Sequence, residues 1–238
     1  MAIILNIETA TKNCSVGLSN GEDLIALKEL AAESYSHAEQ LHIFIDAVFK
    51  QAGITPNQIA AVAVSKGPGS FTGLRIGVAA AKGLCVALEK PLISVDTLEI
   101  LARAVKNIKP DTLIVPMIDA RRMEVYSAVF DKNYQQTRAV EAQIIDKYSF
   151  NNYLDKHKVI FLGDATEKCA EAIIHKNATF LNGFLPSAAE MQVLSFQKYK
   201  HQQFEDVAYF ESTSKLLNKM CLFMLYFVVK INYSYGYT

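Results

Sequence analysis

Hydrophobic and polar positions alternate with a period of two along the first part of the chain. Residues 2–7 and 14–18 are short apolar or alternating runs on either side of a polar turn, which predicts a β-hairpin. Asn20-Gly21 is a strong turn signal, and a third apolar run follows at 24–30. We therefore expect the chain to open with three strands joined by tight turns.

A helical period replaces this alternation after residue 35. Leucine, isoleucine and valine at helical spacing predict a helix over 36–52, and Gly53 is its expected stop. The pattern then predicts a strand at 59–64, a glycine turn, a helix at 72–88, a strand at 92–95 and a helix at 97–105. The predicted order of the first half is βββαβαβα.

The second half again begins with strands. A polar, proline-containing break at 107–111 marks the expected domain boundary. Beyond it the pattern predicts strands at 113–118, 124–130 and 137–145, a helix at 148–156, a strand at 159–162, and helices at 165–174 and 188–200. We assign residues 1–107 to a first lobe, 108–211 to a second lobe, and 212–238 to a divergent hydrophobic tail.

Composition and charge narrow the class of protein. The 238 residues are 51% hydrophobic and 20% charged, which permits a large core and argues against disorder. The formal net charge is zero and there is no run of lysine or arginine, so the chain's own electrostatics do not favour nucleic-acid binding. Four scattered cysteines without a CxxC pair are typical of reduced thiols, and polar Asn6 and Glu8 argue against a signal peptide. We expect a cytoplasmic location without membrane attachment.

A glycine-rich stretch, KGPGSFTGLRIG at residues 66–77, connects a predicted buried strand to an apolar helix. A glycine loop at a helix N-terminus can hold a phosphate, but this one lacks the P-loop ending and is not GxGxxG. The other interpretation is a structural strand-to-helix turn, with Ser70 or Thr72 as the helix cap. Either way, the residues of interest in this loop are Gly67, Pro68, Gly69, Ser70, Phe71, Thr72 and Arg75.

Small residues form a stripe on the helix that follows. Gly73, Gly77, Ala81 and Cys85 are spaced four apart, which would let another helix backbone approach closely. The helix is expected to be buried, either by the chain itself or by a partner. We take the partner interface to be this helix and the helix at 36–52, through Gly73, Gly77, Ala81, Cys85, Leu74, Leu41, Phe44 and Ile45.

Three motifs resemble the bacterial TsaB family: IETATKNCSVGL near the start, SKGPGSFTGLRIG, and IDARRMEVY at 118–126. The resemblance covers residues 2–211. It implies an α/β, duplicated actin-like and sugar-kinase-like fold of the ribonuclease H-like type, with two lobes that each open with a β-meander. It also implies a subunit of the machinery that makes N6-threonylcarbamoyladenosine in tRNA, in which a homologous TsaD-type partner is the enzyme and carries the metal.

The residues allow a chemical check on this implied role. Catalytic relatives place two metal-binding histidines four apart at the start of a helix, where the aligned stretch PLISVDTLEIL has Thr97 and Leu101. Leucine cannot ligate a metal and a threonine hydroxyl is a poor ligand, so we predict no metal site and no catalytic residue. There is no HExxH motif, and His37 and His42 lie on different sides of a helix, which favours solvated or capping roles.

Acidic and basic residues at two strand ends are the remaining candidates for ligand contact. Glu8 follows the first strand in a hairpin with no glycine until Gly17, so we expect it to organise the loop rather than to bind metal or phosphate. In the second lobe, four residues could form salt bridges at the lobe junction or contact a partner or ligand: Asp119, Arg121, Arg122 and Glu124. The arginine pair suits an anion.

The tail departs from the family pattern. Residues 221–229 are uninterrupted and apolar, but nine residues of helix span only about 14 Å, too short to cross a bilayer. Either the segment packs on the body as a divergent final helix, or it reflects a shifted reading frame or fusion and is an aggregation hazard. We favour the second interpretation.

These observations lead to one leading hypothesis. We expect a non-catalytic scaffold that binds a TsaD-type transferase through its first lobe, within a complex that also contains a TsaE-type ATPase and contacts tRNA indirectly. The chain alone is expected to bind no cofactor, and the alternative site for ATP or ADP is the complex interface. The alternatives are an independent actin-fold ATPase or small-molecule kinase, and a homodimer in the absence of the partner.

Overall fold

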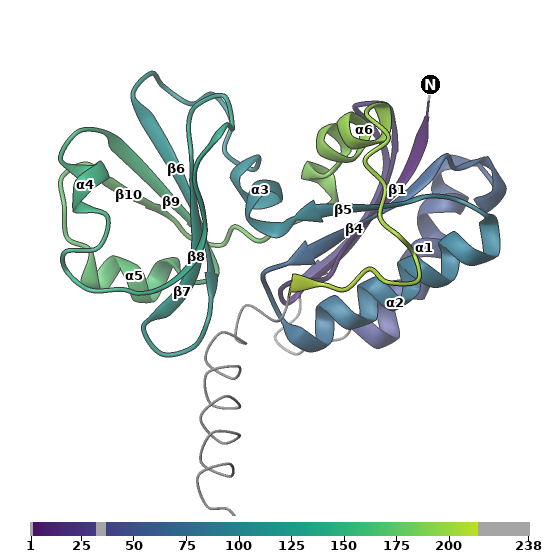
Figure 1. Ribbon diagram of the computed structural model, residues 1–238, viewed down its shortest axis with the longest axis horizontal. Coiled ribbons are helices and arrows are strands. Elements are labelled where there is room, and N and C mark those ends of the chain that lie inside the picture. The colour runs from purple at the N-terminus through teal and green to yellow at the C-terminus, as the bar shows by residue number, and fades with distance from the viewer. Residues whose placement is uncertain (1, 32–36, 214–238) are drawn as a thin grey trace, which may run out of the picture.

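The computed structural model describes residues 2–31 and 37–213, which form two lobes that each contain a five-stranded sheet (Figure 1). The first sheet and its helices comprise β1 (Ile3–Glu8), β2 (Asn13–Asn20), β3 (Asp23–Ala31), α1 (His37–Ala52), the 3-10 helix η1 (Pro56–Gln58), β4 (Ala61–Gly67), α2 (Phe71–Leu88) and β5 (Leu92–Asp96). The short helix α3 (Thr97–Ala102) lies between the lobes.

The second lobe follows after a polar connection. It comprises β6 (Thr112–Asp119), β7 (Glu124–Phe130), β8 (Gln136–Ile144), α4 (Asn151–Leu154), β9 (Lys158–Gly163), α5 (Thr166–Ala172) and β10 (Ala178–Leu181). The chain continues through the 3-10 helix η2 (Ala188–Glu190) and α6 (Gln192–Lys200).

The two sheets have the same topology. Their strand orders are β3-β2-β1-β4-β5 and β8-β7-β6-β9-β10, with the first three strands of each lobe antiparallel and the last two added in parallel. The β-meander at the start of each lobe is therefore as predicted. This repeated order is the duplicated ribonuclease H-like arrangement of actin-like and sugar-kinase-like proteins, and it confirms the expected fold class.

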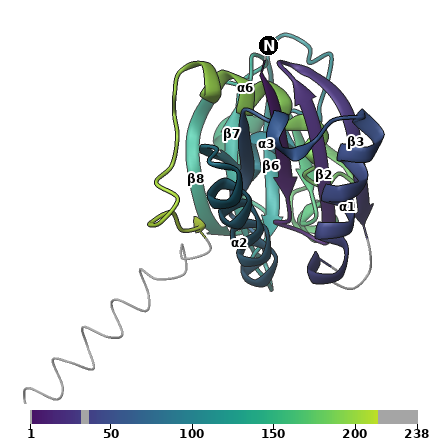
Figure 2. The same cartoon turned by 90° about the vertical axis from the view of Figure 1, so that its right-hand side faces the viewer.

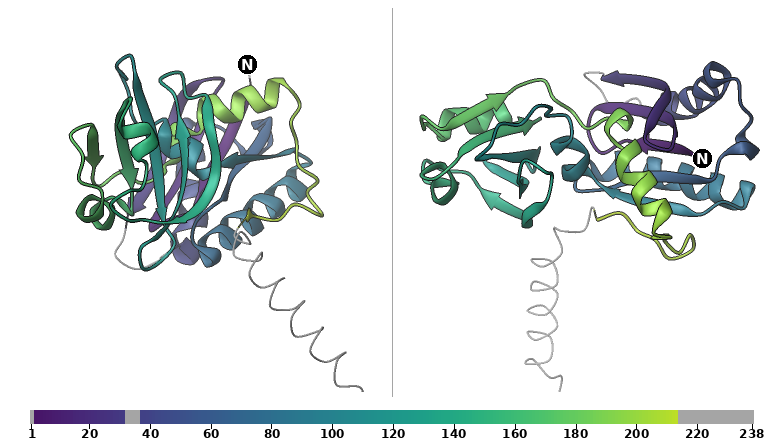
Figure 3. Two further views of the ribbon diagram at one scale, coloured as in Figure 1. Left: turned by 60° about the vertical axis from the view of Figure 1, so that its left-hand side comes forward. Right: turned by 90° about the horizontal axis from the view of Figure 1, so that it is seen from above.

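Both faces of the first sheet are covered, which explains its nearly continuous apolar strands. Leu5, Val62 and Leu92 point to one face and pack with the buried sides of α1 and α2, which lie together on that face (Figure 2). The alternate positions Ile4 and Ala63 point to the other face and pack with buried residues of η2 and α6. Figure 3 shows α6 crossing the first lobe on this opposite face.

The return of the chain to the first lobe corrects the predicted lobe boundaries. Of the described residues, those from 186 to 213 belong to the first lobe: the Asn13 side-chain amide donates to Pro186 O at 3.0 Å, Ala188 and Met191 pack on one face of the first sheet, and Phe210 packs with the core on its other face. The predicted second lobe at 108–211 is therefore too long. Periodicity could not reveal this, because an amphipathic helix does not specify which sheet it covers.

Most local predictions are confirmed, with three differences. The Asn20-Gly21 turn and the stop at Gly53 occur as expected, with positive φ at both glycines. The helix expected at 188–200 begins as η2 and continues as α6, the helix expected at 148–156 is reduced to α4, and β10 was not predicted. Most of the tail, residues 214–238, lies outside the described residues.

Candidate functional site

The glycine-rich loop is shaped around the chain's own first hairpin. A Cβ added to Gly69 would overlap the carbonyl oxygen of Ala10, and one added to Gly73 would overlap that of Thr9. A Cβ on Gly77 would overlap the Thr9 hydroxyl. The β1–β2 turn is thus seated directly on the loop and the first two turns of α2, and glycine is the residue that permits this approach.

Two amides of the loop are already occupied by the chain. Ser70 N donates to Ala10 O at 2.6 Å, and Gly73 N donates to the Ser70 hydroxyl at 3.2 Å, which makes Ser70 the N-cap of α2. Gly67 has a φ of 107° and precedes Pro68. These contacts support the interpretation of the glycine stretch as a structural strand-to-helix turn over its interpretation as a phosphate-binding loop.

The structure corrects the position of the predicted partner interface. The small-residue stripe lies on the inward side of α2, so its members contact the chain's own hairpin and sheet instead of facing outward. Seven of the residues assigned to the interface are buried and Phe44 is half-buried: Gly73, Gly77, Ala81, Cys85, Leu74, Leu41 and Ile45. The sequence did not show which side of the helix faces inward, because both sides carry small residues.

The outward side of α2 is also largely apolar, whereas on α1 the exposed Ile43 stands among charged residues such as Asp46 and Lys50. Ile43 on α1 is 59% exposed, and Val86 on α2 is 71% exposed. Ala79 and Gly83 on α2 are exposed as well, and a Cβ on Gly83 would meet open space. At the N-terminal end, the Arg75 guanidinium lies 4.3 Å from the centroid of the exposed Phe71 ring, and Thr72 is exposed.

Glu8 is the most unusual titratable group of the first lobe. It ends β1, is fully buried, and accepts a hydrogen bond from Ala10 N at 2.5 Å through Oε1. Its Oε2 has no hydrogen-bond partner among the described residues, and burial raises the pKa of Glu8 to about 7. The contact with Ala10 agrees with the predicted role of Glu8 in organising the loop.

His37 completes the packing around this hairpin. It is buried at the start of α1, and its Nε2 lies 2.7 Å from Thr11 O. Of the two roles predicted for His37, solvated or capping, the structure contradicts the solvated one, because the ring packs beside Gly73 beneath the β1–β2 turn. Burial lowers its pKa, which favours the neutral imidazole.

The equivalent turn of the second lobe, between β6 and β7, has a different character. Arg121 and Arg122 both have positive φ, at 72° and 49°, and are exposed. The Lys168 ammonium donates to Asp119 Oδ1 at 2.9 Å, to Arg122 O at 2.7 Å and to Glu124 O at 2.8 Å. The predicted candidates are thus brought together in one turn, and Lys168 is the member that sequence reasoning missed.

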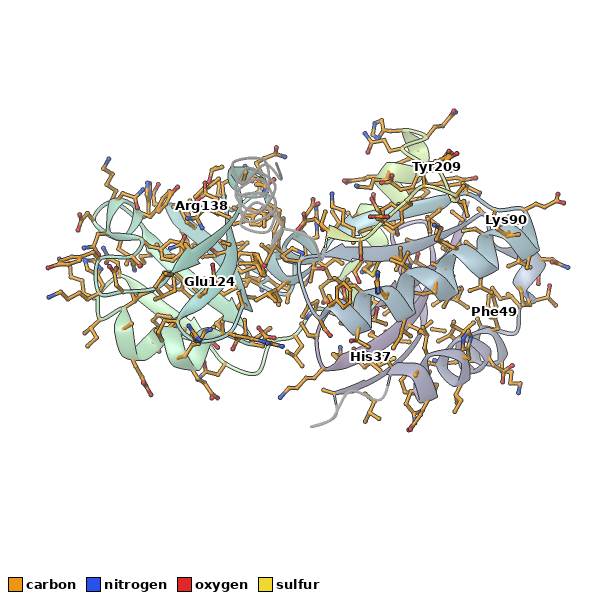
Figure 4. All side chains as sticks on the ribbon, turned by 60° about the horizontal axis from the view of Figure 1, so that its bottom comes forward. His37, Phe49, Lys90, Glu124, Arg138 and Tyr209 are labelled. Atoms are coloured by element: carbon orange, nitrogen blue, oxygen red, sulfur yellow. The ribbon has the colours of Figure 1, made fainter. Side chains whose placement is uncertain are left out.

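These second-lobe residues lie away from the first hairpin. Glu124 and Arg138 are in the second lobe, across from His37 and Phe49 in the first (Figure 4). The negative charge of Asp119 is balanced locally by Lys168, and Asp164 accepts from Asp119 N at 2.8 Å. Salt bridges from Arg121 or Arg122 do not occur among the described residues.

The positions compared with metal-binding histidines lie in an apolar lobe junction. Asp96 caps α3 by accepting from Leu98 N at 3.0 Å, while Thr97 and Leu101 are both fully buried. Leu101 packs with residues of the second sheet such as Ile118 and approaches Gly163. Within residues 2–31 and 37–213 there is no group of three His, Cys, Asp or Glu side chains that could hold a metal ion.

A charged cluster beside this junction was not predicted. Burial raises the pKa of Asp96 and of Glu99, and burial lowers that of Lys198, with Lys66 close enough to affect all three. The Ser94 hydroxyl donates to Glu205 Oε1 at 2.5 Å in the same region. The members come from β4, β5, α3, α6 and the segment after it, so no local motif could have revealed the cluster.

α2 is also the one helix among the described residues that is long and apolar enough to cross a membrane by length and composition alone. Core helices of globular proteins pass the same test, and one side of α2 packs in the first-lobe core. The length and hydropathy of α2 are therefore only weak evidence for a membrane-spanning helix.

Comparisons with known proteins agree with this fold. A family model described as TsaD, tRNA N6-adenosine threonylcarbamoyltransferase, matches residues 29–220. The tRNA threonylcarbamoyladenosine biosynthesis protein TsaB of Haemophilus influenzae is 28% identical over 205 residues, which are 82% of this chain and 86% of that protein. The protein of the same name from Bacillus subtilis is 30% identical over 190 residues, 79% of this chain and 81% of that protein.

Solved structures add the fold. YeaZ from Pseudomonas aeruginosa superposes with a TM-score of 0.76 at 22% identity, covering 88% of this chain and 97% of that one. Another structure from the same organism, described as an uncharacterized protein with similarity to peptidase YeaZ, has a TM-score of 0.78 at 22% identity and covers 89% and 98%. The chain therefore belongs to the TsaB family, within the wider family that the TsaD model describes.

Proposed function

We propose that the chain is a non-catalytic scaffold of the complex that makes N6-threonylcarbamoyladenosine at position 37 of tRNA. The observation that carries the proposal is the lobe junction: Leu101, which the family resemblance aligns with a metal-binding histidine of catalytic relatives, is fully buried and packs between the lobes. Family membership supplies the pathway, since its named relatives are biosynthesis proteins for this nucleoside. The chemistry then belongs to a TsaD-type partner.

The partner is proposed to bind the outward side of α1 and α2. This moves the interface from the buried stripe to Ile43, Ala79, Gly83 and Val86, which are exposed. An exposed glycine and alanine let a partner helix approach closely, while Ile43 and Val86 supply apolar contact at the edges. A stable interface of this kind buries about 800 Å² on each partner.

Two matched substitutions test this surface. Val86→Arg places a charge on the proposed interface, and Ile174→Arg places the same charge at an 88% exposed position of the second lobe. We expect Val86→Arg to weaken co-elution with a TsaD-type partner at least tenfold, and Ile174→Arg to leave it unchanged. Equal binding by both variants would exclude this surface. A substitution in the buried small-residue stripe, such as Gly77→Leu, would not test this surface, because its side chain would meet Thr9 inside the chain.

Reconstitution tests the function itself. Purified TsaD-type transferase, a TsaE-type ATPase, the threonylcarbamoyl donor and tRNA are combined with and without this chain, and the modified nucleoside is measured by mass spectrometry. We expect modification to depend on the chain, with Val86→Arg deficient and Ile174→Arg active. Modification at the full rate without the chain would contradict the proposal.

Calorimetry with Mg-ATP separates the scaffold from an independent ATPase or kinase. Because Ala10 N and Ser70 N are already hydrogen-bonded within the chain, we propose no nucleotide binding by the chain alone, and ATP or ADP only at the complex interface. Micromolar binding of ATP with turnover in the absence of a partner would overturn the scaffold proposal.

Without a partner, we propose that the same exposed helices pair two copies of the chain.

A further inference from the structure

The turn between β6 and β7 presents two adjacent arginines at the surface of the second lobe. Arg121 and Arg122 are both exposed, and neither forms a salt bridge with another residue in the described ranges 2–31 and 37–213. The planar guanidinium group of arginine pairs well with phosphate and carboxylate oxygens. Two such groups side by side are therefore suited to an anion that comes from outside the chain.

The carboxylates of this turn are occupied by other groups. Asp119 accepts hydrogen bonds from the Lys168 ammonium at 2.9 Å and from Arg121 N, and Asp164 accepts from Asp119 N at 2.8 Å. Glu124 is half-buried at the start of β7. Lys168 thus balances the charge of Asp119, so that the arginine side chains are left without an acidic partner in the turn.

The connection between β8 and α4 adds a lysine and an exposed aromatic ring beside the arginines. Ile145 N donates to Met123 O at 2.8 Å, which joins this connection to the turn. Tyr148 lies three residues further on and is 66% exposed, and the Lys147 ammonium lies 5.0 Å from the centroid of its ring. Asp146 accepts from Tyr148 N at 2.9 Å and so holds the segment in place.

Cations next to an exposed aromatic ring are typical of sites that bind looped or single-stranded RNA. The cations contact phosphates, and an unpaired base stacks on the ring. The chain as a whole has a formal net charge of zero, which is unfavourable for tight binding of nucleic acid by this chain alone. A local contact of this kind can still position an RNA that a larger complex holds.

The turn is separate from the surface proposed for the protein partner. Glu124, which directly follows the turn, lies in the second lobe, whereas Phe49 on α1 lies in the first (Figure 4). The proposed partner surface consists of residues of α1 and α2. An RNA on the turn and a protein on these helices would therefore contact different lobes.

We propose that Arg121, Arg122, Lys147 and Tyr148 bind the phosphate backbone and an unpaired base of the tRNA that the complex modifies. These four residues are called the RNA-contact turn below. The identity of the RNA rests on the proposed function, whereas the capacity of the turn to bind RNA does not. The contact is direct, in addition to the indirect contact with tRNA that the sequence led us to expect.

Two double variants test the arginines with equal changes in charge. Arg121→Asn with Arg122→Asn removes both charges and supplies a residue that tolerates positive φ, so the turn should keep its conformation. Lys132→Gln with Lys176→Gln is the control. Both lysines are exposed and lie at the opposite end of the second sheet, in the β7–β8 turn and before the parallel strand β10.

Fluorescence anisotropy of labelled, unmodified tRNA measures binding by the full chain without a partner, between about 50 and 200 mM salt. We expect the arginine variant to bind at least tenfold more weakly than the native chain at the lower salt concentration, and the control to bind within twofold of it. The slope of log affinity against log salt should fall by roughly 1 to 2, because two phosphate contacts are lost. Equal binding by both variants would overturn the proposal.

Tyr148→Ala tests the stacked base. We expect affinity for tRNA to fall at least about fivefold while the salt slope stays unchanged, because stacking releases no counterions. Tyr209→Ala is the control, since Tyr209 is 84% exposed in the first lobe. Equal losses in both tyrosine variants would contradict stacking on Tyr148.

Competition identifies the class of ligand. ATP and poly-glutamate should displace labelled tRNA much less effectively than unlabelled tRNA does. Displacement by ATP at the same phosphate concentration would assign the turn to a small phosphate ligand. Equally effective displacement by poly-glutamate would assign it to an acidic protein. Either result would overturn the assignment to RNA.

Reconstituted modification separates this proposal from the proposed function. We expect the arginine variant to co-elute with a TsaD-type partner as the native chain does, and to raise KM for tRNA at least fivefold at an unchanged kcat. A native KM for this variant, in a reaction that depends on the chain, would contradict the RNA contact alone. Modification that does not depend on the chain, with RNA binding still lost in the variant, would contradict the proposed function alone.

Discussion

Glu8 is a buried carboxyl whose proton affinity differs between the folded and unfolded chain. Burial raises its pKa from 4.5 to about 7, and the hydrogen bond from Ala10 N offsets this only in part. The folded state therefore keeps a proton that the unfolded state releases near pH 4.5. The free energy of unfolding therefore does not depend on Glu8 ionisation below about pH 4.5. It falls as the pH rises from there through about 7, because the unfolded chain gains the ionised carboxylate first.

Glu8→Gln should remove this pH dependence while keeping the shape of the side chain and an acceptor for Ala10 N. Above pH 7 we expect the variant to be more stable than the native chain, by up to roughly 3 kcal/mol. Near pH 4.5 the two should be similar. Denaturant unfolding at about pH 5 and about pH 8 measures the difference, and a difference that is equal at both pH values would contradict a raised pKa.

Gly77 and Gly83 lie on the same helix but face opposite environments. Gly77→Ala should destabilise the chain by about 1–3 kcal/mol, because its Cβ would overlap the Thr9 hydroxyl. Gly83→Ala should stabilise it by about 1 kcal/mol, because alanine is the better helix former and space is open. Thermal unfolding of both variants checks the signs.

Thr9→Ala provides the control for this pair. The Thr9 hydroxyl has no hydrogen-bond partner among the described residues, so its removal costs little and makes room for a Cβ at position 77. The double variant Thr9→Ala with Gly77→Ala should recover most of the lost stability. Additive losses would indicate that Gly77 is required for another reason.

The turn between β6 and β7 has a backbone conformation that is poorly suited to two of its residues. Arg121 and Arg122 have positive φ, where glycine or asparagine is preferred. Lys168 binds three acceptors of this turn and is 21% exposed at its side chain. Lys168 therefore stabilises the β6–β7 turn, whose own residues, Arg121 and Arg122, do not favour its conformation.

Lys168→Met should destabilise the second lobe by about 1–3 kcal/mol, since three acceptors lose a charged donor. Replacement of the arginine pair by Asn-Gly should recover part of this loss by supplying a sequence that favours the turn. Chemical denaturation in low and high salt provides the measurement. A loss below about 0.5 kcal/mol that disappears in salt would indicate an ordinary surface ion pair.

Elements with local signals were predictable from the sequence, and long-range placement was not. The Asn20-Gly21 turn and the Gly53 stop follow from residue chemistry at those positions and are present, and of the two predicted caps of α2, Ser70 and Thr72, the structure has Ser70. The direction of the α2 stripe was missed because Gly77 and Gly83 look alike in sequence. The four-residue strand β10 was missed because so short a segment carries little periodicity.

At the scale of the molecule, the lobes are joined by a packed helix and by two crossings of the chain. The first crossing lies between α3 and β6, and the second returns from β10 to η2. α3 supplies Leu98, Leu101 and Ala102 to a cluster shared with β6, β7 and β9. The lobes should therefore unfold together as long as this cluster is intact.

Leu101→Ala should weaken that coupling. Removal of a fully buried leucine costs about 2–5 kcal/mol, and here the lost contacts are those between lobes. Leu154→Ala is the matched control, because Leu154 is equally buried but packs within the second lobe. In calorimetry we expect Leu154→Ala to lower the transition temperature, and Leu101→Ala to broaden or split the transition as well. If both variants lower the transition temperature without changing the width of the transition, the junction does not couple the lobes. The only consequence of Leu101 would then be that this position cannot bind a metal.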